Sequence, residues 1–213
     1  ALRFSTSELY YLKGINLLAG KPMFTDDYLY FLRGFQLSPY RLAKVDNTIE
    51  LTFSGCWAEG SMWETIALAI ISELYYRAAL SRTSGHALEN VYSQAQTRLY
   101  GKLGRLKGWS YVSFSDFGQR RRHSFLWQEH VVGLCRDTLG QQFTGTSNTY
   151  LAWRHNLPAI GTNAHELPMV LTALANSDEE MRQAQYRVLE LWQSMYGQGL
   201  RIFLPDTYGS EQF

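Results

Sequence analysis

The sequence contains very few cysteines. Among 213 residues there are only two, Cys56 and Cys135, and they lie far apart in unrelated surroundings. They supply neither a disulfide framework nor a pair of metal ligands. So low a cysteine content is typical of a reducing compartment, and we expect a cytoplasmic protein.

Basic tracts and long apolar runs are also absent. The formal net charge is +1, and no run of Lys and Arg exceeds the triplet Arg120-Arg121-Arg122. This charge balance argues against a nucleic-acid surface. The longest strongly apolar run, residues 65–71, is far shorter than the ~20 residues that a membrane-spanning helix requires. We therefore expect neither a nucleic acid nor a membrane among the partners.

Several common catalytic motifs do not occur. The sequence has no Gly-x-Ser-x-Gly elbow and no dinucleotide-binding fingerprint. Asp116-Phe117-Gly118 matches the metal motif of protein kinases, but the other kinase motifs are missing. His123 and His130 could share a helix face, yet no third zinc ligand accompanies them. These absences exclude the standard hydrolase, kinase, dinucleotide-binding and zinc sites.

The first part of the chain reads as helices and one hairpin. With 46% hydrophobic residues the chain can form one large or two small domains. Residues 41–45 and 48–53 flank Asp46-Asn47 and predict a β-hairpin. Residues 62–80 predict a helix that is apolar on nearly every side, so we expect it to be buried, with Glu73 at a solvated edge. Residues 1–108 are predicted to form an α+β cap region.

From residue 109 strands and helices alternate. The predicted strands cover residues 109–115, 142–144, 158–160 and 200–204. The helices between them are marked by Gly140 as a stop signal, Ser147 or Asn148 as a cap, His165 at a start, and the capping box Ser177-x-x-Glu180. Strands separated by helices predict a parallel sheet. We therefore predict an α/β protein in which residues 109–213 form the first part of an irregular barrel.

Small, hydroxylic and acidic residues follow these strands, at Ser115-Asp116, Gly145-Thr146-Ser147, Gly161-Thr162 and Asp206-Thr207. The carboxyl ends of parallel strands form the ligand-binding rim of such folds. His165 opens a helix just after one of them, where free amides favour an anion, although it could also be an ordinary surface histidine. This set of residues is suited to binding phosphate and ribose, and it does not contain a hydrolase triad.

For the charged residues near the rim, the sequence allows more than one role. One or two of Arg120, Arg121 and Arg122 could face a phosphate, or the triplet could be a solvated turn. Asp116 and Asp206 could hold Mg²⁺ around a pyrophosphate, orient neighbouring groups, or cap helices.

Four segments of the chain resemble the nicotinate phosphoribosyltransferase family, in the same order and at similar spacings. They are Asp116-Phe117-Gly118-Gln119-Arg120-Arg121-Arg122, Phe143-Thr144-Gly145-Thr146-Ser147-Asn148, Gly161-Thr162-Asn163-Ala164-His165-Glu166 and Pro205-Asp206-Thr207-Tyr208-Gly209. Further upstream, Phe53-Ser54-Gly55, Trp63-Glu64 and Ile71-Ser72-Glu73-Leu74 are similar to the same enzymes. The resemblance covers most of the chain, and four separate motifs make it specific.

The resemblance implies a type II phosphoribosyltransferase with an α/β barrel. Such an enzyme joins nicotinate to 5-phosphoribosyl 1-pyrophosphate, giving nicotinate mononucleotide and pyrophosphate for NAD biosynthesis, with coupled ATP hydrolysis as in the ligase class. It implies that ATP transiently phosphorylates His165, where the helix start suits the added negative charge. It also implies a catalytic role for Asp206, Mg²⁺ on the pyrophosphate, and a homodimer.

The same resemblance implies a set of substrate-binding residues, namely Phe117, Arg120, Gly145, Thr146, Ser147 and Thr162. Phe117 would stack on the pyridine ring, and Arg120 would contact the base or the phosphate. Thr162 would touch the nicotinate end. Ser147 stands where relatives that use nicotinamide carry an aspartate, and a neutral serine favours a carboxylate substrate.

Two features of the family are missing from this sequence. One is the amino-terminal Thr-Asp-x-Tyr-Lys stretch, and the other is the set of later barrel strands that hold the phosphate of the product. The chain also begins without Met, so we expect it to be part of a longer protein. Two other functions stay open: a nicotinamide phosphoribosyltransferase, and a noncatalytic nucleotide-binding module.

Overall fold

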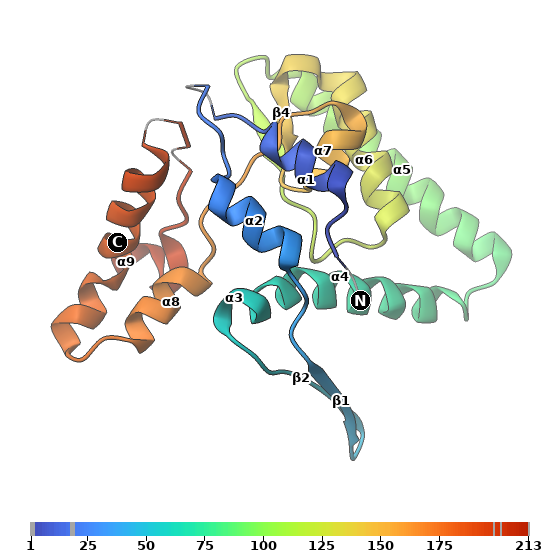
Figure 1. Cartoon of the computed structure of the whole chain (residues 1–213). Helices are drawn as coiled ribbons and strands as arrows, with labels where there is room; N and C mark the ends of the chain where they lie inside the picture. Colours follow the sequence, from blue (N-terminus) through green and yellow to red (C-terminus); the bar gives the residue numbers. More distant parts are fainter. Residues whose placement is uncertain (1–2, 18–19, 198, 201, 213) are drawn as a thin grey trace. The chain divides into compact units, whose positions relative to one another are not determined.

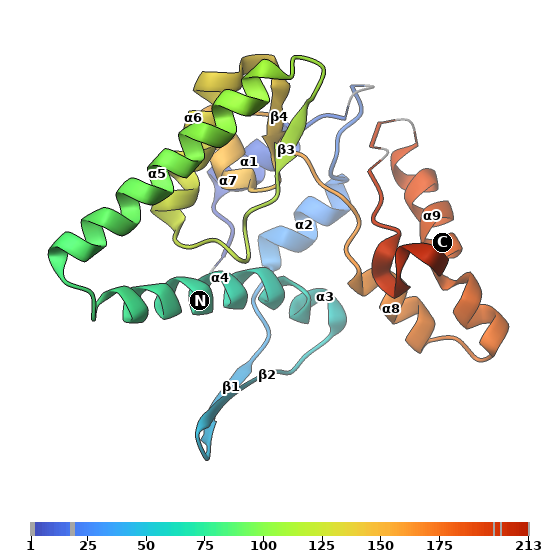
Figure 2. The same ribbon diagram turned by 180° about the vertical axis from the view of Figure 1, so that it is seen from behind.

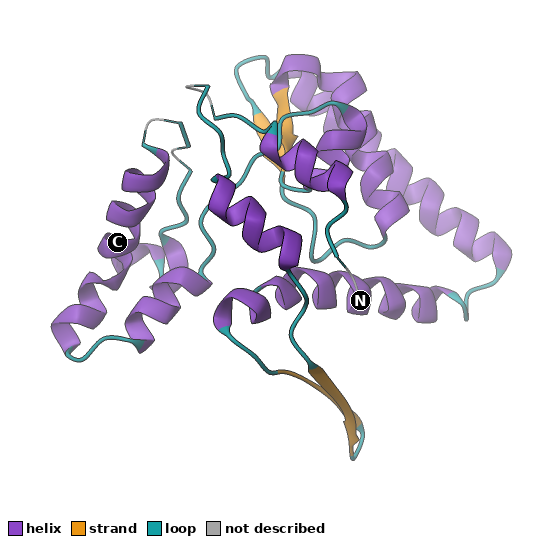
Figure 3. Cartoon of the chain, in the orientation of Figure 1, coloured by secondary structure: helices purple, strands orange, loops and turns teal. Residues whose placement is uncertain are grey.

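The chain divides into two compact units. The computed structural model describes residues 3–17, 20–197, 199–200 and 202–212. Unit 1 comprises Ala1–Phe4 and Gly34–Ile160, and unit 2 comprises Ser5–Arg33 and Gly161–Phe213. Helices dominate and strands are few (Figure 3), and the mixed helix and strand content confirms the α/β class. The predicted division into a cap and a barrel at residues 108 and 109 stays a prediction.

A β-hairpin begins unit 1 after Gly34, and it confirms the predicted turn at Asp46-Asn47. Strands β1 (Tyr40–Val45) and β2 (Thr48–Phe53) pair antiparallel and project as a narrow ribbon (Figures 1 and 2). Trp63 anchors the base of this ribbon. Its indole Nε1 donates to the Ser38 carbonyl oxygen at 2.8 Å, and its ring stacks on Phe53 with centroids 4.9 Å apart.

Three helices follow the hairpin, namely α3 (Trp57–Gly60), α4 (Met62–Leu80) and α5 (Gly85–Gly108). The bounds of α4 agree with the prediction, but its predicted burial is wrong. Only two alanines of α4 are buried, whereas Ile70, Ile71 and Leu74 are about half exposed. An all-round apolar helix is buried only where neighbours cover every side, and the described part of unit 1 leaves these side chains exposed.

The expectation for Glu73 on α4 is also wrong. Its side chain is 18% exposed and is paired with Arg77 at 2.6 Å. The Glu73 Oε2 atom also accepts a hydrogen bond of 3.0 Å from the backbone N–H of Phe125. Because Phe125 begins helix α6 (Phe125–Leu139), the Glu73 carboxylate satisfies an amide that has no partner within its own helix.

A small parallel sheet carries the rest of unit 1. Strand β3 (Phe114–Asp116) pairs with β4 (Phe143–Thr146), and Thr146 forms a further parallel bridge to Ala159. The connecting elements are α6 (Phe125–Leu139), the 3-10 helix η1 (Gly140–Gln142) and α7 (Thr149–His155). The core between sheet and helices consists of Leu103, Val132, Cys135, Leu139, Phe143 and Leu151. The predicted parallel pairing is confirmed here, as is the end of α6 at Gly140.

The predicted strand at 109–115 is shorter than expected, because residues 109–113 form a turn. The N–H of Val112 donates to the Trp109 carbonyl oxygen at 2.9 Å. The side-chain amide of Gln142 then donates to the carbonyl oxygens of Leu106, Trp109 and Val112. A side chain thus satisfies backbone groups that a neighbouring strand would otherwise bind.

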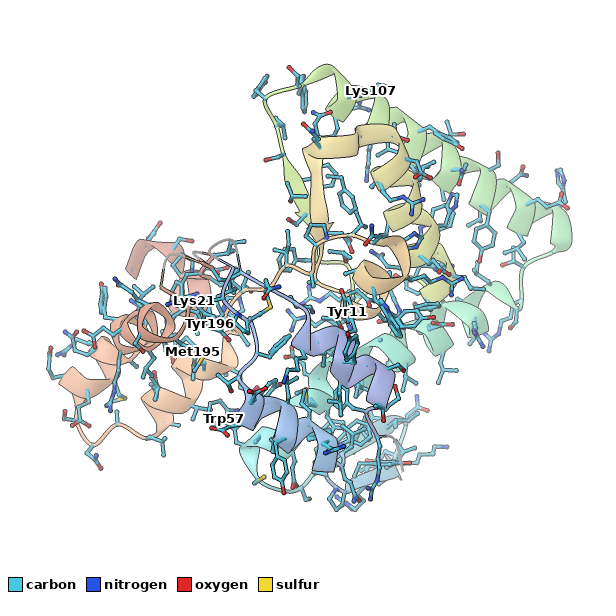
Figure 4. The ribbon with its side chains drawn as sticks, turned by 45° about the horizontal axis from the view of Figure 1, so that its top comes forward. Tyr11, Lys21, Trp57, Lys107, Met195 and Tyr196 are labelled. Atoms are coloured by element: carbon cyan, nitrogen blue, oxygen red, sulfur yellow. The ribbon has the colours of Figure 1, made fainter. Side chains whose placement is uncertain are left out.

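Unit 2 is helical in its described part. Its helices are α1 (Thr6–Lys13), α2 (Asp26–Gly34), α8 (Glu166–Ala173), α9 (Asp178–Tyr196), and the 3-10 helices η2 (Asp206–Tyr208) and η3 (Ser210–Gln212). Helix α8 packs against α9. Figure 4 shows Met195 and Tyr196 on the last turn of α9, and Gly197 caps this end of the helix.

Two predictions in unit 2 need correction. The Ser177 side chain caps α9 by accepting from the Glu180 N–H, but the Glu180 carboxylate accepts from Asn176 N–H at 2.7 Å, so the expected reciprocal box does not form. The predicted strand at 200–204 is wrong for residues 202–204, which belong to no strand, while Arg201 lies outside the described residues. The N–H of Leu204 instead donates to a side chain.

No helix in the described ranges is long and apolar enough to cross a membrane.

Candidate functional site

The predicted site residues divide between the two units. Unit 1 carries Phe117, Arg120, Gly145, Thr146 and Ser147, and unit 2 carries Thr162, His165 and Asp206. In unit 1 Asp116 binds both Thr146 and Ser147, and in unit 2 His165 lies beside Asp206. That the two groups share one rim stays a prediction.

Asp116, at the end of β3, is the centre of the group in unit 1. Its Oδ1 atom accepts from the Gly118 N–H at 3.1 Å and from Gln128 Nε2 at 2.8 Å, and its Oδ2 atom accepts from Thr146 Oγ1 at 2.8 Å. Of the alternatives left open for Asp116, this geometry favours the orientation of neighbouring groups. Asp116 does not cap α6, because the Ser124 side chain does so by accepting from Trp127 N–H.

The turn after β4 is closely packed on the next segment of the chain. Gly145 has φ +142°, and a Cβ atom there would overlap the Pro158 carbonyl oxygen, so only glycine fits. Thr146 is fully buried; its N–H donates to the same carbonyl oxygen at 3.2 Å and its own carbonyl accepts from Ile160 N–H at 3.1 Å. Since its hydroxyl donates to the Asp116 carboxylate, Thr146 has a structural role. Its contact with substrate stays a prediction.

Ser147 and Asn148 form different hydrogen bonds in this turn. The Asn148 side chain caps α7 by accepting from the Leu151 N–H at 3.2 Å, which decides between the two predicted caps. The cap therefore does not use the hydroxyl of Ser147, which is half-buried. The N–H of Ser147 donates to the Asp116 carbonyl oxygen at 2.8 Å and ties this turn to the end of β3.

The aromatic and basic residues after β3 are exposed to different degrees. The Phe117 ring is 48% exposed and is available for stacking. Arg120 forms an ion pair with Glu64 of α4, and both side chains are nearly half exposed. The Arg122 guanidinium lies 5.2 Å from the centre of the Phe125 ring. An anion that bound Arg120 would have to compete with the Glu64 carboxylate.

His165 is the centre of the group in unit 2, and it precedes α8 as predicted. Its Nδ1 atom is hydrogen-bonded to Thr207 Oγ1 at 3.0 Å, and its Nε2 atom lies 3.7 Å from Asp206 Oδ1. The imidazole is 38% exposed and the Asp206 carboxylate 56% exposed. Two predicted catalytic residues are therefore neighbours, and the hydroxyl of Thr207, a predicted rim residue without an assigned role, orients the ring.

A second contact joins the same two segments of unit 2. Asn163 is buried, and its Oδ1 atom accepts from the Leu204 N–H at 2.7 Å. The Thr162 hydroxyl donates to the Asn163 carbonyl oxygen at 2.8 Å. The side chain of Asn163 thus fixes the distance between the two segments that carry His165 and Asp206.

Sequence reasoning missed Gln128, and it placed Thr207 on the predicted rim without giving it a role. Gln128 lies on the inward face of α6, four residues before buried Val132, and a polar residue at such a core position was the available signal. Thr207 follows Asp206 directly, but nothing in its local pattern indicates a histidine partner. Among the residues that the structure describes, no three His, Cys, Asp or Glu side chains are grouped to hold a metal ion.

Comparison with known proteins adds to this geometry. Residues 112–213 match the model of the Nicotinate phosphoribosyltransferase (NAPRTase) family. The structure of nicotinate phosphoribosyltransferase from Porphyromonas gingivalis is similar over 100% of this chain and 51% of its own, with 28% identity and a TM-score of 0.81. The enzyme from Vibrio cholerae is similar over 92% of this chain and 44% of its own, with 27% identity and a TM-score of 0.74.

A protein from Saccharomyces cerevisiae has the same fold at 24% identity and a TM-score of 0.76, over 100% of this chain and 52% of its own. The chain therefore spans about half the length of the solved structures it matches. The family match covers all four motifs in full and nearly all of residues 109–213, and the structural similarity extends to the hairpin and α4. The resemblance to the nicotinate phosphoribosyltransferase family is therefore confirmed by the family match over residues 112–213 and by the similarity of the fold along the whole chain.

Proposed function

We propose that the protein is a nicotinate phosphoribosyltransferase of NAD biosynthesis. It would form nicotinate mononucleotide and pyrophosphate from nicotinate and 5-phosphoribosyl 1-pyrophosphate, with ATP hydrolysis coupled through a phosphohistidine. The observation that supports this most directly is the exposed His165 imidazole at the start of α8, held between Thr207 and Asp206 in a chain that matches this family.

The coupling step needs an oriented imidazole. A ring nitrogen of His165 would attack the γ-phosphorus of ATP, so that a P–N bond forms, the P–O bond to ADP breaks and ADP leaves. Water would later cleave the P–N bond and release phosphate. The hydrogen bond to Thr207 limits rotation of the ring, and the amides at the start of α8 favour the added negative charge.

The transfer step would form a bond between the pyridine nitrogen and C1 of the ribose while the bond from C1 to pyrophosphate breaks. An oxocarbenium-like state is stabilised mainly by positioning and electrostatics. The half-exposed Phe117 ring offers a surface for the pyridine, and Ser147 offers a neutral neighbour for its carboxylate. Arg120 would bind the base or a phosphate after release from Glu64.

Mg²⁺ fits one of the two aspartates better than the other. Both oxygens of Asp116 already accept hydrogen bonds, from three donors in all. The carboxylate of Asp206 is more than half exposed. Mg²⁺ is commonly held by one or two carboxylates together with substrate phosphates. We therefore propose that Asp206 would hold the Mg²⁺ ion. An ion bound to the pyrophosphate would offset the negative charge of this leaving group.

Two further properties are proposed from the family resemblance. We propose a homodimer, which light scattering on the purified protein would test. We also propose a cytoplasmic location, and the two free cysteines support a reducing environment.

The test is mononucleotide formation by the full-length protein. It is incubated with 5-phosphoribosyl 1-pyrophosphate and either nicotinate or nicotinamide, with and without ATP, and the products are separated by chromatography. We expect nicotinate mononucleotide, formed faster with ATP. Equal or better use of nicotinamide would instead indicate the amide enzyme. Nucleotide binding without either product would indicate a noncatalytic module.

A further inference from the structure

Gln128 is a buried polar residue on a helix face that is otherwise apolar. It lies in α6, whose other buried side chains are Val132, Cys135 and Leu139. An amide in such surroundings is retained at low cost only if it is hydrogen-bonded. Its Nε2 atom donates to Asp116 Oδ1 at 2.8 Å, so the helix reaches directly to the end of β3.

Asp116 also forms hydrogen bonds with residues of two turns. Through its carboxylate it holds the Gly118 N–H and the Thr146 hydroxyl, and its carbonyl oxygen accepts from the Ser147 N–H. The Thr146 hydroxyl in turn accepts from the Asn148 N–H at 3.1 Å. One side chain of α6 therefore supports the turn that carries Phe117 and the turn that carries Ser147.

The turn at Gly118 lies directly on the amide of Gln128. A Cβ atom at Gly118 would lie 2.7 Å from Gln128 Nε2 and 3.0 Å from Asp116 Oδ1, so a side chain there would have to displace the Gln128 amide. Helix α6 packs against β4 within unit 1 (Figures 1 and 2), so its position is set by the core. Loss of the amide would let the Phe117 turn move relative to the Ser147 turn.

We propose that Gln128 is a positioning residue for base binding. Without touching substrate, its amide holds Asp116 so that Phe117 and Ser147 stay at a constant separation. The inference rests on the proposed function, because the nicotinate ring and carboxylate are the groups that these two residues would meet. A misplacement of about 1 Å in such a pair is enough to lower catalytic efficiency by up to about a hundredfold.

The first test measures the turns themselves and needs no activity. Gln128→Met removes the donor but keeps an unbranched side chain of similar size. Hydrogen exchange followed by mass spectrometry compares it with the unaltered full-length protein. We expect the amides of Gly118 and Ser147 to exchange at least about tenfold faster, while amides in the middle of α6 do not change. Unchanged exchange at both turns would overturn the proposal.

The second test measures steady-state kinetics. In Gln128→Met we expect the KM for nicotinate to rise about tenfold or more, with kcat and the KM for 5-phosphoribosyl 1-pyrophosphate changed less than about threefold. Thr146→Val removes the hydroxyl from the same network, keeps its shape, and should give the same pattern. It keeps the proposal testable if Gln128→Met does not fold.

Gln142→Met is the matched control. It makes the same substitution at a glutamine whose side-chain amide donates to the carbonyl oxygens of Leu106, Trp109 and Val112, before the start of β4. It should lower thermal stability but leave the KM for nicotinate unchanged. An equal rise in KM in this control would show that Gln128 acts only through general stability, and it would overturn the proposal.

The proposal and the proposed function can fail separately. If the unaltered protein makes nicotinate mononucleotide and Gln128→Met has a normal KM, the positioning role is wrong and the function stands. If the unaltered protein makes none, the function is wrong, and the exchange rates still decide whether Gln128 holds the two turns.

Discussion

The Nδ1 atom of His165 lies 3.0 Å from Thr207 Oγ1, although 42 positions separate the two residues in the chain. The contact joins the start of α8 to η2 within unit 2. A hydrogen bond to one ring nitrogen of a histidine sets the tautomer and leaves the other nitrogen for a different role. We therefore expect Thr207 to influence the chemistry of His165, the residue for which the family resemblance implies phosphorylation.

Removal of the Thr207 hydroxyl should slow phosphorylation of His165. For Thr207→Val we expect ATP-dependent ³²P incorporation to fall at least about tenfold, because the ring loses its orientation. His165→Ala should abolish the labelling and shift the thermal midpoint only slightly, since a partly exposed side chain contributes little to the core. The label should resist base and be lost in acid, as a phosphohistidine is.

Thr97→Val is the control for this series, because the hydroxyl of Thr97 donates to the Ser93 carbonyl oxygen on exposed α5. It should not change the labelling. A His165→Ala protein that still incorporates ³²P would exclude His165 as the acceptor.

A negative charge at residue 147 should impair the use of nicotinate. In Ser147→Asp a second carboxylate would meet the carboxylate of the substrate in a half-buried site. Like charges a few ångströms apart in such surroundings repel by on the order of 1 kcal/mol or more. We therefore expect the KM for nicotinate to rise about tenfold, with nicotinamide unaffected or better used. Ser147→Ala, which adds no charge, should change the ratio of the two bases little.

Gly145 should tolerate no side chain. Gly145→Ala places a Cβ atom against the Pro158 carbonyl oxygen and forces a non-glycine residue to φ +142°. We expect a loss of about 3 kcal/mol or more in the free energy of unfolding, measured by urea denaturation. Gly104→Ala is the matched control, because Gly104 is exposed in α5 with no atom near its Cβ position. It should stabilise by about 0.5–1 kcal/mol, so equal effects of both substitutions would contradict the structure.

The two cysteines should differ sharply in reactivity. Cys135 is buried in the core of unit 1, and burial, assisted by the nearby Asp116 charge, raises the pKa of its thiol to about 11. Cys56 is exposed. Because the thiolate is the reactive form, an aromatic disulfide reagent at pH 8 should titrate one thiol quickly and the second only after denaturation. Two fast thiols in the native protein would show that the core around Cys135 opens.

Glu73 should make the free energy of unfolding depend on pH in the acidic range. The hydrogen bond from the Phe125 N–H, with a smaller contribution from Arg77, lowers the pKa of this carboxyl below its ordinary value of 4.5. The folded state therefore favours the ionised form, and the stabilisation is present above pH 4.5 and is lost as the pH falls through the lower folded value.

Substitution of Glu73 tests this directly. Glu73→Gln should cost about 1 kcal/mol at pH 7, and the difference from the unaltered protein should shrink as the pH falls below 4.5. Thermal midpoints measured across this range would show it. Glu89→Gln, at an 82% exposed side chain on α5, should show no such convergence.

Local patterns predicted those parts of the fold that local interactions decide. The hairpin turn at Asp46-Asn47 needs only a short polar turn between alternating residues, and α6 ends at Gly140 because the chain adopts positive φ there. The helix start after His165 and the family motifs were also readable from neighbouring residues. The resemblance to nicotinate phosphoribosyltransferases rested on such short stretches, and the family match confirms it.

Only the tertiary structure decided which groups meet across long separations. Periodicity did not show that α4 is covered on few sides, or that Gln142 and Asn163 side chains would bind carbonyl and N–H groups that strands were expected to use. Nor could it place Gln128 on Asp116. The physical reason is that a helix or strand pattern records the preferences of neighbouring residues, whereas burial and hydrogen-bond partners depend on which distant segments the fold places beside them.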